Sequence, residues 1–318
     1  MASSDDRSEV IMPRSEPGRE SKLIRIRATR LFGRDWAIAY PFLLPVLAVL
    51  IGLVAYPFFS AIWLSLTSTT IGSPGTFIGL ANYQRLLGDR TFSNSVFVSI
   101  VYTVSAVGLK FLVGLLAALV LNEALPPKNL WRMLLFLPWS VPVVINAYTW
   151  RWIYDDLSGV LSQTLIQWGL TDHYILWLAD KTLALKSVIV VELWQGTPFY
   201  IMTFLAGLAA IPTELYEAAK VDGAGAMRRF LHVTLPCLTP VITIVVLLST
   251  IWTANNMQLV YVLTRGGPAR TTEIFPYLAY ATAIQAKNLG LGAAIPLVFF
   301  PFMAVVIYFL TRRMLRQE

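Results

Sequence analysis

Six long apolar blocks, separated by polar linkers, dominate the pattern of hydrophobic and polar positions along the chain. They lie near Tyr40–Leu64, Ser95–Leu121, Met133–Ile153, Leu183–Leu208, Pro236–Val262 and Leu291–Leu310. A helix that crosses the hydrocarbon core of a bilayer needs roughly 20 predominantly apolar residues, and each block has about that length or more. Alternating strand patterns are absent, so helices are the expected spanning elements. The pattern predicts an all-α integral membrane protein with six transmembrane helices.

Residues 1–34 differ from the rest of the chain because they are polar and basic and contain few large apolar side chains. Such a segment cannot bury a core, so we expect a disordered tail before a membrane domain over residues 35–318. The tail has no apolar core of its own, and the first apolar block is too long for a signal peptide. We therefore do not expect a cleaved signal.

Composition and charge agree with a membrane protein and predict its orientation. The chain has 56% hydrophobic and only 14% charged residues, whereas soluble domains carry nearer a quarter charged residues. Sixteen Lys and Arg lie in the N-terminal tail, the second and fourth linkers and the C-terminus, against six in the other three linkers. Because Lys and Arg accumulate in cytoplasmic loops, we expect both termini in the cytoplasm and no nucleic-acid partner for the net charge of +7.

The fourth linker, near residues 211–235, has the pattern of a short cytoplasmic helix. Pro212 and Glu214 are typical of a helix start, and Gly223 is a natural stop. One face would carry mostly small residues, namely Leu215, Ala218, Ala219 and Asp222. A second short helix could cover Ala226–Val233. From the residues alone, docking into a partner's groove and lying on lipid headgroups are equally good interpretations.

Polar residues at membrane depth mark a possible substrate path, because they are costly in lipid and usually face a cavity or a partner. The candidates are Asn146, Glu192, Gln195, Gly196, Thr253, Asn255 and Asn256. Amides beside aromatic rings suit a sugar, since amides bond to hydroxyls and a ring covers the apolar face of a pyranose. The alternative is hydrogen bonding between helices. Proline in many spans is either ordinary enrichment or a sign of bent helices around a cavity.

Lys110 lies inside the second predicted span and has two possible roles. It could extend toward the interface, or it could pair with Glu192. In straight helices with level ends, Lys110 would lie about 10 Å further from the outer face than Glu192. A direct pair would need offset or tilted helices.

Several segments together resemble a known family. The loop resembles the EAA loop of ABC importer permeases through Glu217-Ala218-Ala219, Asp222-Gly223-Ala224, Phe230, Leu235-Pro236 and Pro240. Further similarity covers Phe77–Tyr83, Arg132–Pro142, Trp194–Leu208 and Leu263–Pro268. The chain past its tail is similar to the MalF/UgpA-type branch of binding-protein-dependent carbohydrate importers.

This resemblance implies a type I ABC importer permease fold and a role in alternating access. It implies a coupling helix that docks on an ATPase subunit through Glu217, Ala218, Ala219, Asp222, Gly223 and Ala224. The implied partners are a second permease, two ATP-binding cassette subunits, an extracytoplasmic solute-binding protein and a disaccharide, oligosaccharide or polyol. ATP and Mg would bind to the ATPase, in a bacterial cytoplasmic membrane. In relatives the substrate site lies near the midplane on the matching spans, which favours Asn146, Gly196 and Asn256.

Motifs of other protein classes are missing from the sequence. There is no Walker-type glycine loop, so we expect no ATP or other cofactor bound by this chain. His173 and His232 lie in different linkers and Cys237 is the lone cysteine, so no metal site is expected. No nucleophile motif suggests a membrane-embedded enzyme. An ion-coupled secondary transporter is the main alternative, disfavoured because Glu192 is the only acid placed deep in a span.

Overall fold

The computed structural model describes residues 36–123 and 128–315. Within these ranges the chain is helical and has no strand, only two isolated β-bridges, Thr67 with Phe77 and Thr70 with Ser73. The chain divides into two compact units at Ser60 and Ala61. The predicted tail, residues 1–34, lies outside the described residues.

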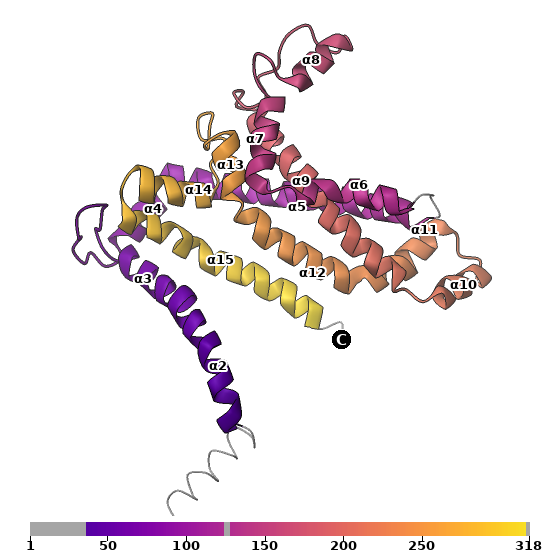
Figure 1. The fold of residues 1–318 in the computed structure, drawn as a ribbon, viewed down its shortest axis with the longest axis horizontal. Helices are drawn as coiled ribbons and strands as arrows, with labels where there is room; N and C mark the ends of the chain where they lie inside the picture. The colour runs from indigo at the N-terminus through magenta and orange to yellow at the C-terminus, as the bar shows by residue number, and fades with distance from the viewer. Residues whose placement is uncertain (1–35, 124–127, 316–318) are drawn as a thin grey trace, which may run out of the picture. The chain divides into compact units, whose positions relative to one another are not determined.

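The first unit contains the first predicted span. Its described residues form α2 (Trp36–Leu50), η1 (Ile51–Ala55) and the start of α3 (Tyr56–Ser65), which continues into the second unit (Figure 1). The most apolar 18 residues within Phe42–Ser65 are all unburied, although Ser65 itself is buried. An apolar helix with so little buried surface requires an apolar solvent, which is what a bilayer supplies.

The second unit holds the remaining elements, and Figure 1 shows their order. They are α4 (Ala81–Gly88), α5 (Arg90–Asn122), α6 (Lys128–Ser140), α7 (Val143–Ile153), α8 (Val160–Gln167), α9 (Ala184–Ala209), α10 (Thr213–Val221), α11 (Ala226–Arg229), η2 (Phe230–Thr234), α12 (Leu235–Ala254), α13 (Met257–Leu263), α14 (Phe275–Tyr280), η3 (Ala281–Gln285) and α15 (Leu289–Leu315).

The described helices confirm the membrane fold but not the full count of six spans. Four are long and apolar enough to cross a bilayer: Phe42–Ser65, Arg90–Asn122, Ala184–Ala209 and Ala226–Ala254. A fifth arises if Leu130–Ser140 and Val143–Ile153, which meet at 94°, form one broken span. The last predicted block coincides with α15, of which Leu289–Pro301 is apolar but shorter than a full span within the described residues.

Two predicted spans are interrupted by breaks. The third block is two helices, because Pro142 at the start of α7 has extended backbone and supplies no amide proton to continue α6. In the fifth block α12 ends at Ala254, and two residues separate it from α13, which begins at Met257. The break in the third block confirms a bent helix there, since its two halves meet at 94°.

The predicted separate helix over Ala226–Val233 is wrong. Instead, helix runs without interruption from Ala226 to Ala254, so the loop's second helix is the first part of the fifth span. The join is a π-helical turn, η2, in which the Leu235 amide donates to the Phe230 carbonyl. Pro236 has no amide proton, and the wider turn lets the helix pass it without a stop.

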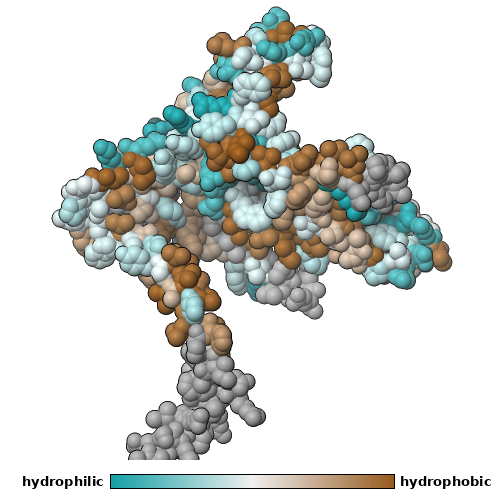
Figure 2. Space-filling model, in the orientation of Figure 1, coloured by the Kyte–Doolittle hydropathy of each residue, from teal (hydrophilic) through white to brown (hydrophobic). Residues whose placement is uncertain are grey.

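Helices α5 and α9 lie side by side and form the centre of the second unit (Figure 1). One apolar cluster surrounds Tyr102, Val188 and Leu259, and another surrounds Tyr200 and Leu238. In Figure 2 hydrophilic surface gathers over α10 and around α8, whereas hydrophobic surface predominates over α6 and α12. Large exposed apolar side chains on α5, such as Phe97 and Val104, fit contact with lipid or a partner helix.

Gly114 sets the distance between α5 and α9, since a Cβ there would lie 2.4 Å from the Cβ of Tyr200. We expect Gly114→Ala to destabilise the fold by roughly 1–3 kcal/mol, because one helix must move away from the other. Thermal unfolding of the detergent-purified protein measures this loss. Gly108→Ala, on the same helix with nothing within 4 Å, is the matched control. Equal unfolding temperatures for the two variants would contradict the packing argument.

Candidate functional site

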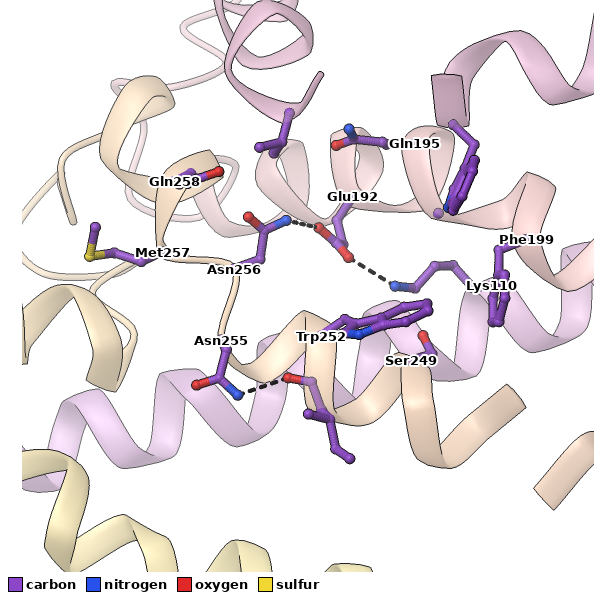
Figure 3. A pocket seen from close by; sticks show the side chains of 14 residues that line it. Lys110, Glu192, Gln195, Phe199, Ser249, Trp252, Asn255, Asn256, Met257 and Gln258 are labelled. Carbon is purple, nitrogen blue, oxygen red and sulfur yellow. Dashed lines mark hydrogen bonds and ion pairs between the residues drawn. The ribbon is translucent and has the colours of Figure 1, made fainter. Parts of the chain in front are cut away.

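A polar cavity of about 550 Å³ lies where α5, α9 and α12 meet the two helix breaks (Figure 3). Its lining combines amides, aromatic rings and one pair of opposite charges. The residues are Lys110, Trp139, Val143, Glu192, Gln195, Gly196, Phe199, Ser249, Ile251, Trp252, Asn255, Asn256, Met257 and Gln258.

Glu192 is the centre of a buried hydrogen-bond network in the wall of this cavity. Its Oε1 accepts from Lys110 Nζ at 2.9 Å and from Thr253 Oγ1 at 3.2 Å. Its Oε2 accepts from Tyr102 Oη at 3.1 Å and from Asn256 Nδ2 at 2.7 Å. Lys110 Nζ also donates to Thr253 Oγ1 at 2.7 Å. The carboxylate therefore joins α5, α9, α12 and the start of α13.

The direct contact between Lys110 and Glu192 decides between the two roles expected for the lysine. The ammonium does not extend to the interface, and the two side chains are only 3% and 8% exposed. The 10 Å offset assumed helices with level ends, and that assumption is wrong. Helix α5 begins at Arg90, before the predicted start, and Tyr102 and Lys110 both reach the same carboxylate. Along the axis of α5, Glu192 therefore lies between Tyr102 and Lys110.

Gln195 binds the break between α6 and α7. Its Nε2 donates to the Val141 carbonyl at 3.2 Å, and its Oε1 accepts from Asn146 Nδ2 at 2.9 Å. Asn146 is 1% exposed and follows Pro142 on the first turn of α7. A carbonyl left without a helical partner at membrane depth costs several kcal/mol unless another donor reaches it. Gln195 supplies that donor, which explains how a 94° bend is tolerated.

The break between α12 and α13 is bound to Glu192 from both sides. Thr253 lies at the end of α12, and Asn256 caps α13 by accepting from the Leu259 amide at 3.4 Å. Asn256 points toward Glu192, whereas Asn255 points away and donates to the Ile251 carbonyl at 2.8 Å (Figure 3). These hydrogen bonds fix the orientations of Thr253, Asn255 and Asn256 relative to the cavity.

The structure brings the seven predicted substrate-path residues together, in different roles. Glu192, Gln195, Gly196, Asn255 and Asn256 line the cavity, while Asn146 and Thr253 lie behind this wall. A Cβ at Gly196 would lie 2.6 Å from Lys110 Cδ, so this glycine provides room for the lysine. The candidate set omitted Lys110, although a cation deep in a span is a signal of function.

Aromatic side chains complete the cavity and were not among the predicted site residues. Trp139, Phe199 and Trp252 belong to three different helices, so nothing in the local sequence indicates that they meet. Trp252 and Phe199 pack edge to face at 5.1 Å between ring centroids. Together with the amides, the rings can bind hydroxyl groups and cover an apolar sugar face.

The predicted loop helix forms as α10 and ends where the sequence indicates. Gly223 has φ +73°, the Ala224 amide donates to the Ala219 carbonyl, and the Gly223 amide donates to the Lys220 carbonyl. This pair of bonds is the Schellman motif that closes a helix at a left-handed glycine. Tyr216 Oη contacts Thr234 Oγ1 at 3.0 Å and so attaches α10 to the fifth span.

One side of α10 remains exposed. Glu217, Ala218 and Asp222 are exposed, Ala219 is half-buried, and Val221 is 89% exposed. Within the second unit this helix therefore leaves the predicted face largely uncovered. The docking role of this surface stays a prediction.

A second cavity, of about 350 Å³, lies among loop residues that include Asp155 and Asp156. Hydrogen bonds from Ser158 and Leu157 lower the pKa of the Asp155 carboxyl. Burial, together with the neighbouring Asp155 charge, raises the pKa of the Asp156 carboxyl. Within the described residues, no group of three His, Cys, Asp or Glu side chains is arranged to hold a metal ion.

Comparison with known proteins identifies the family. The profile of the family described as "Binding-protein-dependent transport system inner membrane component" matches residues 110–317. The chain belongs to this family. It is therefore a transport permease, and membership argues against the ion-coupled secondary transporter considered from the sequence.

Relatives of this permease have similar length. It is 35% identical to the trehalose/maltose transport system permease protein MalF of Thermococcus litoralis over 86% of this chain and 92% of that protein. It is 32% identical to the trehalose transport system permease protein SugA of Mycobacterium tuberculosis, over 88% and 92% of the two chains.

The fold of the permease matches a solved ABC importer. A chain from a bacterial ABC transporter involved in the import of the acidic polysaccharide alginate superposes with a TM-score of 0.78 at 20% identity. The match covers 91% of this permease and 99% of that chain. It confirms the predicted permease fold, which the isolated sequence blocks could only suggest.

Removing one charge from the buried pair should destabilise the permease. We expect Lys110→Met or Glu192→Gln alone to cost roughly 3–5 kcal/mol, because each leaves one charge without its counter-ion. The double variant should cost less than the sum of the two. Thermal unfolding of the purified permease gives all three values, and additive effects would show that the pair has no mutual stabilisation.

Proposed function

We propose that this permease is one of two transmembrane subunits of an ATP-driven, binding-protein-dependent importer of a disaccharide, oligosaccharide or related polyol. The observation that carries the proposal is the cavity of amides and aromatic rings at membrane depth, in a chain similar to permeases named for trehalose and maltose. Amides at fixed positions can bind hydroxyl groups, and the rings of Trp139 and Trp252, which also line the cavity, can cover the apolar face of a sugar.

The proposed topology has six spans in a bacterial cytoplasmic membrane, with both termini in the cytoplasm. The broken pair α6 and α7 would form the third span, the helix from Ala226 the fifth, and α15 the sixth. The excess of Lys and Arg in the tail, the second and fourth linkers and the C-terminus supports this orientation. It leaves α10 on the cytoplasmic side.

The proposed partners are a second permease, two ATPase subunits and an extracytoplasmic solute-binding protein. ATP and Mg would bind to the ATPase subunits, with no cofactor held by this chain. One solved relative in fold is an alginate ABC transporter in complex with a periplasmic protein bound to an alginate pentasaccharide. An open cavity in the wall of one chain also suits closure by a second permease.

The exposed side of α10 would couple ATP hydrolysis to transport. Its contact residues are Glu217, Ala218, Ala219, Asp222, Gly223 and Ala224. Small side chains let a partner surface approach the helix closely. Helix α9 ends at Ala209 and α10 begins at Thr213, so a movement of α10 has a short covalent path to the cavity.

Reconstitution tests the proposed function. Proteoliposomes with both permeases and the ATPase, ATP enclosed and the binding protein outside, should accumulate radiolabelled trehalose or maltose. Uptake should stop when the ATPase is omitted, because the permease has no energy source of its own. Sugar uptake that needs no ATPase and follows an ion gradient would refute the proposal.

Two glycines of the coupling loop provide a matched test of coupling. Gly223 has φ +73° and Gly225 has φ −66°, and a Cβ added at either position would meet no other atom within 4 Å. Gly223→Ala should cost about 1–2 kcal/mol locally and shift the docking surface, because a side chain is strained at positive φ. We expect several-fold lower substrate-stimulated ATPase activity for Gly223→Ala and little change for Gly225→Ala. Equal activity in both variants would contradict the role of the helix stop.

A further inference from the structure

The polar cavity contains both signs of charge in direct contact. Among its lining residues Lys110 is the one cation and Glu192 the one anion, with 2.9 Å between Nζ and Oε1. Both side chains are more than nine-tenths buried, so solvent screens the pair weakly. The wall that a ligand meets is therefore electrically neutral overall and still strongly polar.

Glu192 has no capacity left for a ligand. A carboxylate accepts about four hydrogen bonds, and Glu192 accepts four, from Tyr102, Lys110, Thr253 and Asn256. A cationic ligand would have to break one of these bonds to find an acceptor. Glu192 therefore acts within the protein, as a positioning residue for the groups that surround it.

Lys110 differs because only two of its three N–H donors have an acceptor among the residues that the structure describes. An ammonium has three N–H donors, and two are taken by Glu192 and Thr253. The lysine crosses Gly196 to reach them, since a Cβ at Gly196 would lie 2.6 Å from Cδ and 3.1 Å from Nζ. Both residues line the cavity, and Figure 3 shows the lysine extended across it toward Glu192. The third N–H is thus available to an acceptor in the cavity.

We propose that Lys110 is a specificity-determining residue that donates its third N–H to a ligand oxygen, while its pairing with Glu192 restricts the cavity to uncharged polyhydroxy ligands. This inference rests on the proposed carbohydrate function. A carboxylated ligand entering the cavity loses hydration and finds a cation already neutralised by Glu192. A cationic ligand finds a carboxylate whose acceptor positions are filled. A neutral hydroxyl or ether oxygen needs only the one donor that remains.

The test compares ligand charge in the assembled transporter without its binding protein, so that the permease cavity is the site measured. The probes are trehalose and maltose as neutral sugars and glucuronic acid-containing disaccharides as carboxylated ones, with binding followed by tryptophan fluorescence. The wild type should prefer the neutral probes. Glu192→Gln should shift the ratio of affinities on the order of tenfold toward the carboxylated probes, because Lys110 loses its counter-ion.

Further variants separate specificity from structure. Lys110→Met combined with Glu192→Gln should lose that shift, since no cation remains to attract a carboxylate. Gly196→Ala should weaken neutral-sugar binding by displacing Lys110 while both charges are kept, and Gly108→Ala should not. An unchanged affinity ratio in Glu192→Gln, with the wild type binding neutral sugars, would overturn the role of Lys110. A wild-type transporter that binds no sugar probe at all would instead overturn the proposed carbohydrate function.

Discussion

The structure depends on stabilising the charge of one carboxylate, that of Glu192, at membrane depth. An isolated ionised group in a low-dielectric interior is so costly that a protein must either pair it or keep it neutral. Glu192 is paired with Lys110 at 2.9 Å and receives three further hydrogen bonds. The donors come from α5, α12 and the start of α13, so satisfying one charge fixes four segments of the chain around the same point. Polar groups at membrane depth are costly where they face lipid, so they gather around this buried charge. The cavity lies at the same point because these groups line it.

The same turn of α9 also makes the helix breaks possible. Glu192 binds Thr253 and Asn256 on the two sides of the break in the fifth block. Gln195, three residues further along, binds the Val141 carbonyl at the break in the third. Irregular backbone is tolerated at membrane depth only where protein or cavity water satisfies it. Gly196, between these contacts, has no side chain and leaves room for Lys110. A few neighbouring residues of one continuous helix, α9, therefore hold two broken helices in place.

Features that depend on local chemistry could be predicted from the sequence, and features that depend on register between helices could not. The end of α10 at Gly223 follows from one residue type in one turn, and the helical character of the blocks follows from their length and polarity. The pair of Lys110 and Glu192 depends instead on the register between α5, which starts at Arg90, and α9, which starts at Ala184. No local sequence pattern predicts this register. For the same reason Trp139, Phe199 and Trp252 were missed, since they meet only when three helices pack. The helix from Ala226 was divided wrongly because Pro236 suggests a start, whereas the π-turn at Phe230–Thr234 accommodates it.

Because local features can be predicted and inter-helix register cannot, the sequence says more about how the proposed transport is driven than about which ligand is transported. The proposed coupling surface lies on a single short helix, α10, so its residues are close together in the sequence. The cavity is assembled from distant segments, and its selectivity depends on which donors remain after the internal network is satisfied. The two regions are connected by α9, which runs from the cavity turn at Glu192 to Ala209 and joins α10 through three residues. A helix of that length is about 25 Å long and transmits displacement along its axis. In the proposed mechanism, a movement of α10 would therefore act on the turn that holds both helix breaks, and the groups that bind the ligand would be reoriented together.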